Sequence, residues 1–410
     1  MRFLYDIGIR LYSLAARILA LWNPKARLWV RGRRNWEEPL EKALGGRGPV
    51  LWYHCASLGE FEQGRPVLEA MKEACPDKAV LLTFFSPSGY EKRKDYPGAD
   101  HVMYLPLDTR RNARRFFDRV QVDAAIFIKY EFWYHFLTSL HRRQIPTYLA
   151  SGIFRPGQIF FRWYGGWYRG FLRSFTHIFV QNQESARLLE SAGIRSVSVA
   201  GDTRFDRVKK AAETPYAHPG VEAFVKGHRV LVAGSTWEPD EALLEEVRGR
   251  LDPDLRWIIA PHELSAAHVK KLQSRFPGSV LFSGLAGDPP AGARVLIVDS
   301  IGQLSYLYRY GLLAYIGGGF GKGIHNILEA AVYGNPVVFG PAWEKFTEAR
   351  EMLAIGAAFH IASTEEMLST VHQQLEDSKL LKTSSDLARN YVLERLGATS
   401  RIVAAMCKKA

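Results

Sequence analysis

With 410 residues, 47% of them hydrophobic, the chain is long enough for two domains, and its composition excludes wholesale disorder. Its three cysteines match neither a metal-ligand spacing nor a disulfide framework, which favours a reducing compartment. The formal net charge of +12 favours an anionic partner, which could be a nucleic acid, an anionic membrane or a phosphorylated substrate.

The first predicted element is an amphipathic helix at the N-terminus. Its polar residues share one face because they are spaced by four, three and four positions: Asp6, Arg10, Ser13 and Arg17. The apolar residues that cover the rest are Phe3, Leu4, Ile7, Leu11, Leu14, Ile18 and Leu21. Charged residues keep the uncharged runs too short for a membrane span and unlike the core of a cleavable signal peptide.

We therefore expect residues 1–34, which hold eight Lys/Arg and one acid, to lie in a membrane interface. The residues expected at headgroup level are Trp22, Trp29, Arg31, Arg33 and Arg34. A second stretch, 151–176, combines four arginines and no acid with nine aromatic residues, and it suits a lipid headgroup boundary better than a groove that tracks phosphates. The alternatives are that the helix docks on the protein's own core or that it is a single-pass signal anchor.

Short β-rich runs alternate with helical patterns along most of the chain. Runs that are apolar throughout, separated by helices, are typical of buried parallel strands. The predicted strands of the first half are 49–55, 79–85, 101–107, 123–129, 146–150, 177–182 and 196–201. Those of the second half are 229–235, 255–261, 279–283, 294–300, 312–318 and 335–340. This order predicts an α/β protein with two doubly wound, Rossmann-like domains facing across a cleft, which is the GT-B architecture.

The domain boundaries follow from a polar, proline-containing seam at 203–228. We expect a membrane-interface segment, an acceptor domain, a nucleotide-sugar domain and a C-terminal helix that packs back on the first domain. Their bounds are 1–34, 35–205, 206–385 and 386–410. In doubly wound sheets ligands bind at the carboxyl ends of the strands, so the loops after strands are the places to look for chemistry.

The most specific of these loops follows the strand 312–318. Gly317, Gly318 and Gly319 would leave backbone N–H groups free for an anion, and a helix starting near Asn326 would add its N-terminal dipole. Glu329 lies three residues after Asn326, so it either caps the helix or binds a ribose. The segment predicts a site for a nucleotide-activated sugar.

Two carboxylates follow strands of the first half. Glu60 opens the helix after the first strand, and it is either a charge at a helix N-terminus or a general base. Glu131 follows the fully apolar fourth strand, where a carboxylate is often buried with a structural or a functional role. Because both lie at carboxyl ends of strands in one sheet, they could converge.

Other strand-end residues are weaker candidates. Arg204 could meet a phosphate near the seam or be solvated, and His262, after Pro261, could bind a base or be a satisfied polar residue. The loop Ile301, Gly302 and Gln303 offers backbone groups to a base edge. No acidic cluster has metal-ligand spacing, so we expect a transferase without metal or cofactor, in which dipoles and basic groups stabilise the leaving group.

Taken in chain order, six motifs give the sequence a family resemblance. They are SLGE (57–60), YEFW (130–133), GDTRFD (201–206), PHE (261–263), DSIGQL (299–304) and GGGFGKGIHNILEAAVYGNPVVFGP (317–341). They resemble the Kdo transferases, the 3-deoxy-D-manno-octulosonic acid transferases of lipopolysaccharide assembly, over nearly the whole chain. The chain departs from that family's usual residues at Arg204, Pro261, Gln303 and Ala330.

The resemblance implies an inverting GT-B enzyme that moves Kdo from CMP-Kdo to lipid IVA at the cytoplasmic face of the inner membrane, with no nucleic-acid partner. It implies that Glu60 is the proton acceptor and that Glu131 and Arg204 support the transition state. The residues it implies for CMP binding are Pro261, His262, Ile301, Gly302, Gln303, Asn326, Ile327, Leu328 and Glu329.

Three alternatives remain open from the sequence. The first is a GT-B enzyme that uses a UDP- or GDP-sugar, and the second is a sugar-nucleotide epimerase on the same architecture. The third is a non-enzymatic basic protein that binds membranes or nucleic acid. The membrane-directed N-terminus argues against the epimerase, and the ordered strand-end loops argue against the third.

Overall fold

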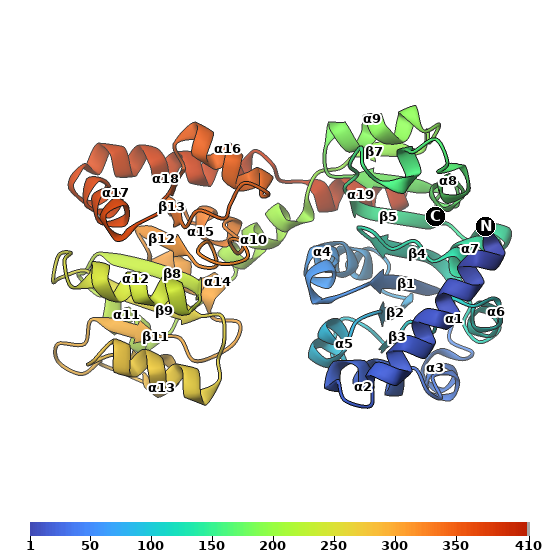
Figure 1. Cartoon of the computed structure of the whole chain (residues 1–410), viewed down its shortest axis with the longest axis horizontal. Helices are drawn as coiled ribbons and strands as arrows, with labels where there is room; N and C mark the ends of the chain where they lie inside the picture. The colour runs from blue at the N-terminus through green and yellow to red at the C-terminus, as the bar shows by residue number, and fades with distance from the viewer. Residues whose placement is uncertain (408–410) are drawn as a thin grey trace. The chain divides into compact units, whose positions relative to one another are not determined.

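The computed structural model of the chain describes residues 1–407, which divide into two compact units. Unit 1 comprises residues 1–207 and 396–407, and unit 2 comprises residues 208–395. Each unit is built on a parallel sheet that carries helices on both faces (Figure 1). The predicted fold of two Rossmann-like doubly wound α/β domains is therefore confirmed.

The sheet of unit 1 has the strand order β3-β2-β1-β4-β5-β6-β7. Its strands are β1 (Val50–Cys55), β2 (Ala79–Phe84), β3 (His101–Tyr104), β4 (Val122–Ile128), β5 (Thr147–Gly152), β6 (His177–Val180) and β7 (Val197–Val199). Its helices are α1 (Arg2–Leu19), α2 (Pro24–Arg31), α3 (Glu37–Leu44), α4 (Leu58–Ala74), α5 (Pro87–Arg93), α6 (Arg110–Phe117), α7 (Tyr134–Arg142), η1 (Ile159–Phe161), α8 (Gly166–Arg173), α9 (Gln183–Ser191) and α19 (Ala398–Cys407). Helix α10 (Thr203–Glu213) crosses into unit 2.

Unit 2 repeats the architecture with the order β10-β11-β9-β8-β12-β13-β14. Its strands are β8 (Val230–Thr236), β9 (Arg256–Pro261), β10 (Val280–Leu281), β11 (Val295–Ile297), β12 (Leu313–Ile316), β13 (Val337–Phe339) and β14 (Ala358–His360). Its helices are α11 (Pro219–Val225), α12 (Glu238–Arg248), α13 (Ala266–Arg275), η2 (Phe282–Gly284), α14 (Leu304–Leu307), η3 (Tyr308–Tyr310), α15 (Leu328–Ala331), α16 (Thr347–Ile355), α17 (Thr364–Glu376) and α18 (Ser378–Leu393).

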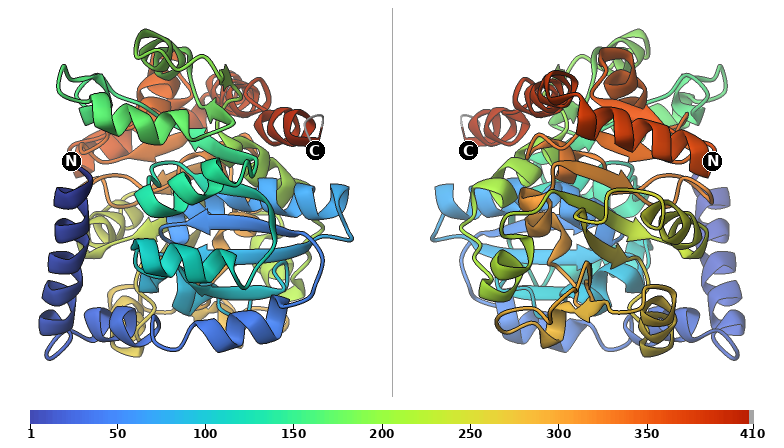
Figure 2. Two further views of the ribbon diagram at one scale, coloured as in Figure 1. Left: turned by 90° about the vertical axis from the view of Figure 1, so that its right-hand side faces the viewer. Right: turned by 90° about the vertical axis from the view of Figure 1, so that its left-hand side faces the viewer.

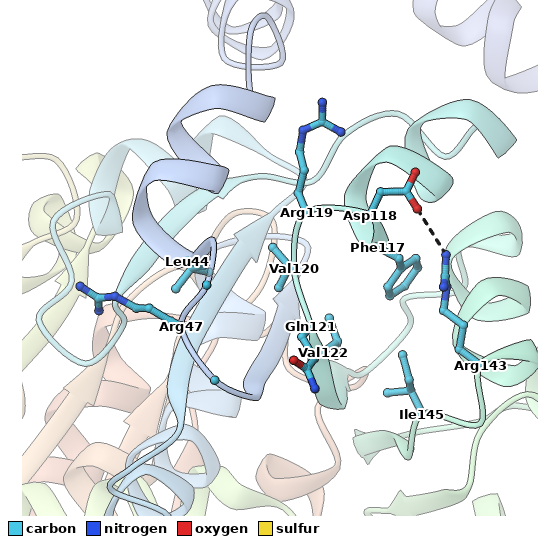
Figure 3. Close-up of a pocket in the computed structure, with 12 residues that line it drawn as sticks. Leu44, Arg47, Phe117, Asp118, Arg119, Val120, Gln121, Val122, Arg143 and Ile145 are labelled. Carbon is cyan, nitrogen blue, oxygen red and sulfur yellow. Dashed lines mark ion pairs between the residues drawn. The ribbon is translucent and has the colours of Figure 1, made fainter.

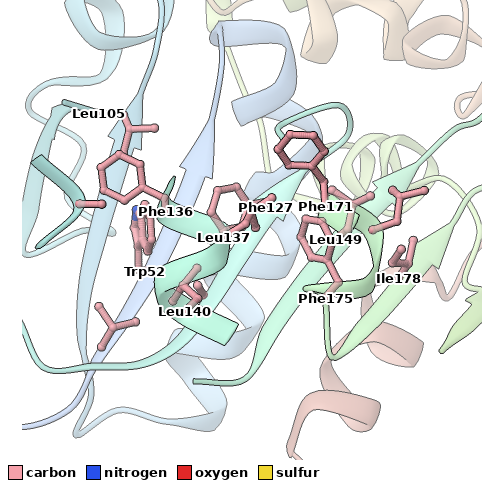
Figure 4. Close-up of a cluster of buried hydrophobic side chains, with 14 of the residues drawn as sticks. Trp52, Leu105, Phe127, Phe136, Leu137, Leu140, Leu149, Phe171, Phe175 and Ile178 are labelled. Atoms are coloured by element: carbon pink, nitrogen blue, oxygen red, sulfur yellow. The ribbon is translucent and has the colours of Figure 1, made fainter. Parts of the chain in front are cut away.

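The core of unit 1 forms because its central strands are apolar on both faces. Every residue of β1 is buried, as expected for a parallel strand covered by helices on both sides. Trp52 of β1 packs its ring 5.2 Å from that of Phe127 and 5.6 Å from that of Phe136, measured between ring centroids (Figure 4). These rings join the sheet to α7, and that packing sets where the loops after β1 and β4 leave the sheet.

The C-terminal segment is divided between the units. Helix α18 belongs to unit 2, whereas α19 packs on α4 of unit 1 and buries Ile402 and Met406 in its core. Asp206 fixes the start of α19, because its carboxylate accepts hydrogen bonds from the backbone of Gly397 (2.7 Å) and Thr399 (2.6 Å). In place of the single helix expected over 386–410, the residues up to 407 form parts of two helices that pack on different units.

The N-terminal segment is two helices, because Asn23 caps α2 through its side chain and Pro24 follows at the first helical position. Helix α1 docks on unit 1 through its polar face. The Tyr5 hydroxyl lies 2.5 Å from the Asp108 carboxylate, and Asp6 lies 2.5 Å from His135 Nε2. Figure 2 shows α1, in dark blue, running along the outside of the unit.

Two residues expected at headgroup level are instead part of unit 1. Trp29 is only 7% exposed, and the Arg33 guanidinium donates to the carbonyls of Leu105 (2.9 Å) and Phe85 (2.6 Å). The prediction for these two residues is wrong, because Trp29 packs between Tyr12 and Phe85, and Arg33 turns inward to the loops that follow β2 and β3. Trp22, Arg31 and Arg34 are exposed.

Candidate functional site

The sequence-predicted carboxylates of unit 1 lie on neighbouring strands. Glu60 follows β1 and Glu131 follows β4, and these two strands pair in parallel, so their carboxyl ends meet at one edge of the sheet. The Cys55 thiol, at the end of β1, interacts electrostatically with both groups. Burial raises its pKa, and the negative charges of Glu60 and Glu131 raise it further. The structure therefore brings the two carboxylates into one neighbourhood.

Glu131 is buried and bonded. Its Oε2 lies 2.9 Å from His54 Nε2 and 2.8 Å from Trp133 Nε1, and its side chain is 11% exposed. His54 is the second-to-last residue of β1 and is fully buried. The sequence singled out neither His54 nor Trp133, although a histidine at the end of an otherwise apolar strand was a signal that could have found the first.

The protons of this network can be assigned from the hydrogen bonds of Thr83. Its hydroxyl donates to the Tyr53 carbonyl (3.2 Å) and accepts from Trp52 Nε1 (2.9 Å), so His54 Nδ1, also at 2.9 Å, is left to donate to it. An imidazole nitrogen and a carboxylate oxygen at 2.9 Å need a proton between them. His54 and Glu131 are therefore joined by a hydrogen bond, which holds the Glu131 carboxylate in place.

Glu60 has a simpler environment. It is the third residue of α4, its side chain is half-buried, and the hydroxyl of the N-cap residue Ser57 donates to its carboxylate. This pair leaves the second carboxylate oxygen of Glu60 available, and the N-terminus of α4 stabilises its negative charge. The position of Glu60 in the first turn of α4, at the carboxyl edge of the sheet, is compatible with both roles that the sequence left open.

Arg204 lies in the first turn of α10, after the loop that follows β7. Its guanidinium makes an ion pair with Asp202 at 2.8 Å, and its own backbone N–H also bonds Asp202 (2.9 Å). Asp202 is held in turn by Gln63 of α4 (2.9 Å). The arginine is therefore positioned by a buried carboxylate and is not simply solvated.

One cavity of unit 1 lies away from this edge. It has a volume of about 650 Å³ and is lined by residues that precede strands, such as Gly48 before β1 and Val120 before β4 (Figure 3). Its charged rim includes the Asp118–Arg143 ion pair at 3.8 Å. Because ligands of doubly wound sheets bind at the carboxyl ends, this cavity does not carry the candidate site.

In unit 2, the glycine turn after β12 is organised by a buried carboxylate that the sequence did not reveal. Asp240 of α12 is 1% exposed and accepts hydrogen bonds from the backbone of Trp237 (2.8 Å) and Gly318 (2.9 Å) and from the Tyr315 hydroxyl (2.7 Å). These three donors compensate the cost of burying its charge. Asp240 thus ties the loop after β8 to the loop after β12.

Two of the three glycine N–H groups expected to be free for an anion are already bonded. Gly317 donates to Gly234 (2.9 Å) and Gly318 donates to Asp240, whereas Gly319 makes no backbone hydrogen bond through its N–H within residues 1–407. The glycines are required for close packing: a Cβ on Gly317 would lie 2.4 Å from the Ser235 carbonyl oxygen, and one on Gly319 would lie 2.5 Å from the backbone of Gly340. The anion-binding capacity of the turn is therefore smaller than predicted.

Aromatic and imidazole rings stack beside this turn. The ring of His262 lies 4.5 Å from those of Trp237 and His325, measured between centroids, and Trp237 Nε1 donates to His325 Nε2 at 2.9 Å. Burial lowers the pKa of His325, and the neighbouring His262 lowers it further. His325 is therefore neutral at pH 7 and can accept that hydrogen bond.

A cavity of about 350 Å³ opens at the same place. It is lined by Trp237, Phe320 and His325 together with the backbone of the glycine turn, and Lys322 is the cation of its lining. A mostly apolar, concave site with few polar groups is typical of a pocket for a small organic ligand. The cavity shares Gly318 and His325 with the segment that the sequence marked as the nucleotide-sugar site.

The other residues predicted to bind CMP differ in accessibility. Ile327, Leu328 and Pro261 have buried side chains, so any contact they make with a ligand must use the backbone. Ile301 is 78% exposed, and Gln303 accepts a hydrogen bond from Tyr216 (3.0 Å).

Asn326 and Glu329 form a local pair at the start of α15. The Asn326 amide donates to the Glu329 carboxylate (3.0 Å), and its carbonyl accepts from the backbone of Leu328 (3.2 Å). This differs from the capping box that the spacing suggested, because Glu329 bonds the side chain of Asn326 and not its backbone. The pair holds the Glu329 carboxylate at the end of the loop after β12.

Backbone strain also gathers at the carboxyl edges. Lys129 after β4 has a φ of 65°, and Ser235 in β8 has a φ of 55°. Residues other than glycine rarely adopt this left-handed conformation, and when they do they are often found at functional sites. Within residues 1–407 no group of three or more His, Cys, Asp or Glu side chains could hold a metal ion, and no helix is long and apolar enough to cross a membrane.

The fold places the chain in a class. A solved UDP-GlcNAc 2-epimerase from Neisseria meningitidis, bound to UDP-GlcNAc, superposes with a TM-score of 0.59 at 16% identity over 88% of this chain and 100% of that one. At such low identity the likeness concerns the fold alone, and it is that of the two-domain GT-B proteins.

Comparison of sequences narrows the class. Residues 33–207 match the model of a family described as 3-deoxy-D-manno-octulosonic-acid transferase (kdotransferase). A 3-deoxy-D-manno-octulosonic acid transferase of Bordetella pertussis is 27% identical over 98% of this chain and 99% of its own length. One of Aquifex aeolicus is 27% identical over 84% of this chain and 91% of its own length. The chain is thus similar to Kdo transferases along almost its whole length, and these relatives indicate that it is a glycosyltransferase.

Proposed function

We propose that the chain transfers Kdo from CMP-Kdo to the lipid A precursor lipid IVA, at the cytoplasmic face of the inner membrane of a Gram-negative bacterium. One observation carries the proposal. The chain aligns with Kdo transferases over almost its whole length and presents, at the carboxyl edge of unit 1, an ionisable Glu60 next to a carboxylate that is fixed by a histidine.

Glu60 is the group suited to proton transfer. Its carboxylate is half-exposed and bonded to a single hydroxyl, so it can accept the proton of an acceptor hydroxyl as that oxygen attacks the anomeric carbon of Kdo. The bond from that carbon to the CMP phosphate breaks, and CMP leaves with the electron pair. Attack opposite the leaving group inverts the anomeric centre.

Glu131 and Arg204 are suited to electrostatic support. Glu131 is held by its hydrogen bond with His54, and Arg204 is oriented by Asp202. Groups that are fixed before the reaction stabilise developing charge without a reorganisation cost. In this proposal Arg204 faces the charge of the leaving phosphate, and Glu131 faces the positive charge that develops on the sugar ring.

The donor is assigned to the carboxyl edge of unit 2. The cavity beside the glycine turn offers flat rings to the cytosine base, and Lys322 in its lining can meet a phosphate. The pair of Asn326 and Glu329 offers a carboxylate to the ribose.

The orientation of α1 supports an acceptor that resides in a membrane. A helix that docked only on its own protein would bury its apolar face. Here the polar face docks, while Phe3 (74% exposed), Leu11 (60%) and Leu21 (72%) point away from unit 1. Trp163 and Tyr164, after η1, are exposed as well. Aromatic and apolar groups presented in this way suit the boundary of a bilayer.

The test is incubation of the full chain with CMP-Kdo and lipid IVA, followed by mass spectrometry of the lipid product. We expect one or more Kdo units to be added, with release of CMP. Parallel reactions with UDP- and GDP-sugars test the donor, and transfer from one of these in place of CMP-Kdo would contradict the proposal. A parallel incubation without lipid IVA tests for a change to the sugar nucleotide alone, which would indicate an epimerase.

A further inference from the structure

A cavity distinct from both strand-end sites lies between α1, α6 and α7 of unit 1. Its volume is about 580 Å³, and six arginines line it: Arg10, Arg110, Arg111, Arg114, Arg142 and Arg143. Three helices that are far apart in the sequence bring them together. Helices α6 and α7 bury their apolar sides in the unit, as α6 does with Ala113, Phe116 and Phe117, and so turn their basic sides outward, whereas α1 docks through its polar face.

Most of this charge has no partner within the protein. Arg143 pairs with Asp118 at 3.8 Å, but the other five arginines make no ion pair and no side-chain hydrogen bond with any residue from 1 to 407. The acid in the lining, Asp6, is engaged by His135 at 2.5 Å and by Arg2 at 3.9 Å. Five guanidinium groups of one sign around one cavity repel each other, and a bound anion would relieve that repulsion.

The cavity adjoins the apolar face of α1. At 100° per residue, Arg10 lies on the flank of the helix, between the side that buries Ser13 and the side that exposes Leu14. A molecule bound to Arg10 can therefore also lie along the apolar face. That combination selects an amphiphile with an anionic head and an apolar tail.

We propose that this cavity binds the phosphate-bearing headgroup of an anionic membrane phospholipid, whose acyl chains lie along the apolar face of α1. The inference rests on the membrane association proposed above and adds to it the site and the chemical class of the lipid. A guanidinium group binds two phosphate oxygens through a pair of hydrogen bonds, so it favours a phosphate held in a defined position. Attraction by a diffuse surface charge needs no such position. A nucleic acid would be expected on an extended basic groove with aromatic groups for its bases, and no aromatic residue lines this cavity.

The experiment measures binding of the full chain to phosphatidylcholine vesicles with and without phosphatidylglycerol, in the absence of CMP-Kdo and lipid IVA. The test variant is R110Q/R114Q. The matched control is R17Q/R31Q, which removes the same charge from exposed arginines of the N-terminal helices that do not line the cavity. We expect R110Q/R114Q to lose about tenfold more affinity for the anionic vesicles than the control. R110K/R114K, which keeps the charge, should recover most of the binding.

Equal losses in the two double variants would overturn the proposal, because attraction would then be diffuse. Binding of inorganic phosphate that R110Q/R114Q abolishes, with unchanged vesicle binding, would assign the cavity to a free anion and also overturn it. So would a loss of RNA binding in place of vesicle binding. Thermal unfolding of each variant checks the fold. R110Q/R114Q should keep transfer to lipid IVA dispersed in detergent; loss of transfer there, with vesicle binding intact, would assign the cavity to the acceptor instead.

Discussion

The two units present polar groups at the same edge of the same kind of sheet, but they use different chemistry there. In unit 1 the edge carries acidic side chains, with Glu60 half-exposed and Glu131 hydrogen-bonded to His54. In unit 2 the buried carboxylate of Asp240 binds backbone and hydroxyl donors, and burial lowers the pKa of the neighbouring His325.

The difference shows how two domains of the same fold can take different parts in one reaction. A carboxylate at the start of a helix that is bonded to a single hydroxyl can gain and lose a proton. A carboxylate with three donors is committed to holding loops in place, so it shapes a site without taking part in proton transfer. The comparison predicts that substitutions in unit 1 affect chemistry and those in unit 2 affect binding.

The largest effect is expected for Glu60→Gln. The amide keeps the shape and can still bond Ser57, but it cannot accept a proton, so kcat should fall by roughly 10²- to 10⁴-fold. Binding of CMP-Kdo, measured by calorimetry, should change little. Glu73→Gln, at the exposed far end of the same helix, is the control and should keep full activity. Full activity of Glu60→Gln would remove the carboxylate from the mechanism.

The next effect concerns the buried pair of unit 1. His54→Ala leaves the Glu131 carboxylate buried without its imidazole hydrogen-bond partner, and we expect the free energy of unfolding to fall by about 3–5 kcal/mol. Glu131→Gln should cost less, about 1 kcal/mol, because a neutral His54 can still accept from Trp133 Nε1 at 3.0 Å. Chemical denaturation measures both. Equal losses of stability in the two variants would show that the buried carboxylate does not depend on His54 in this way.

A smaller effect is expected in unit 2 from Asp240→Asn. The amide turns an N–H toward donors that need an acceptor, so the free energy of unfolding should fall by about 1–3 kcal/mol, and affinity for CMP-Kdo should fall with it. The control is Asp254→Asn, an exposed carboxylate in the turn before β9. If kcat fell while affinity for CMP-Kdo stayed unchanged, the division of roles between the units would be wrong.

The smallest effect is a pH dependence at His325. Because burial lowers its pKa in the folded chain, the unfolded chain binds more protons just below the ordinary value of about 6.5. Stability should therefore fall as the pH drops below that value, by about 1 kcal/mol or less. His325→Gln should flatten the slope of stability between about pH 5 and 7, whereas the exposed His372→Gln should not. His101, whose pKa burial also lowers, should leave a residual slope.

Much of the fold could be read from the sequence, because its signals are local. Fully apolar runs such as β1 and β4 mark buried parallel strands, and each predicted strand has a counterpart in the sheets. The short strand β14 was missed, since its three residues range from buried to exposed and carry no clear pattern. Strand-end loops also located Glu60, Glu131 and the glycine turn, because the carboxyl ends of parallel strands share one edge.

The partners of those residues depend on contacts across the fold. Nothing near Glu131 in the sequence points to His54, which lies 77 positions away, and nothing near Gly318 points to Asp240, 78 positions away. The side chains that make the sites specific therefore came only from the packing.

The sequence by itself determined that α1 is amphipathic and that both halves form parallel α/β sheets, because periodicity and apolar runs express local preferences. Only the tertiary structure decided which face of α1 docks, that Trp29 and Arg33 join the unit, and that five unpaired arginines gather in one cavity. The physical reason is that burial and charge pairing depend on neighbours in space, and a helix with two usable faces can satisfy its local preferences with either one turned inward.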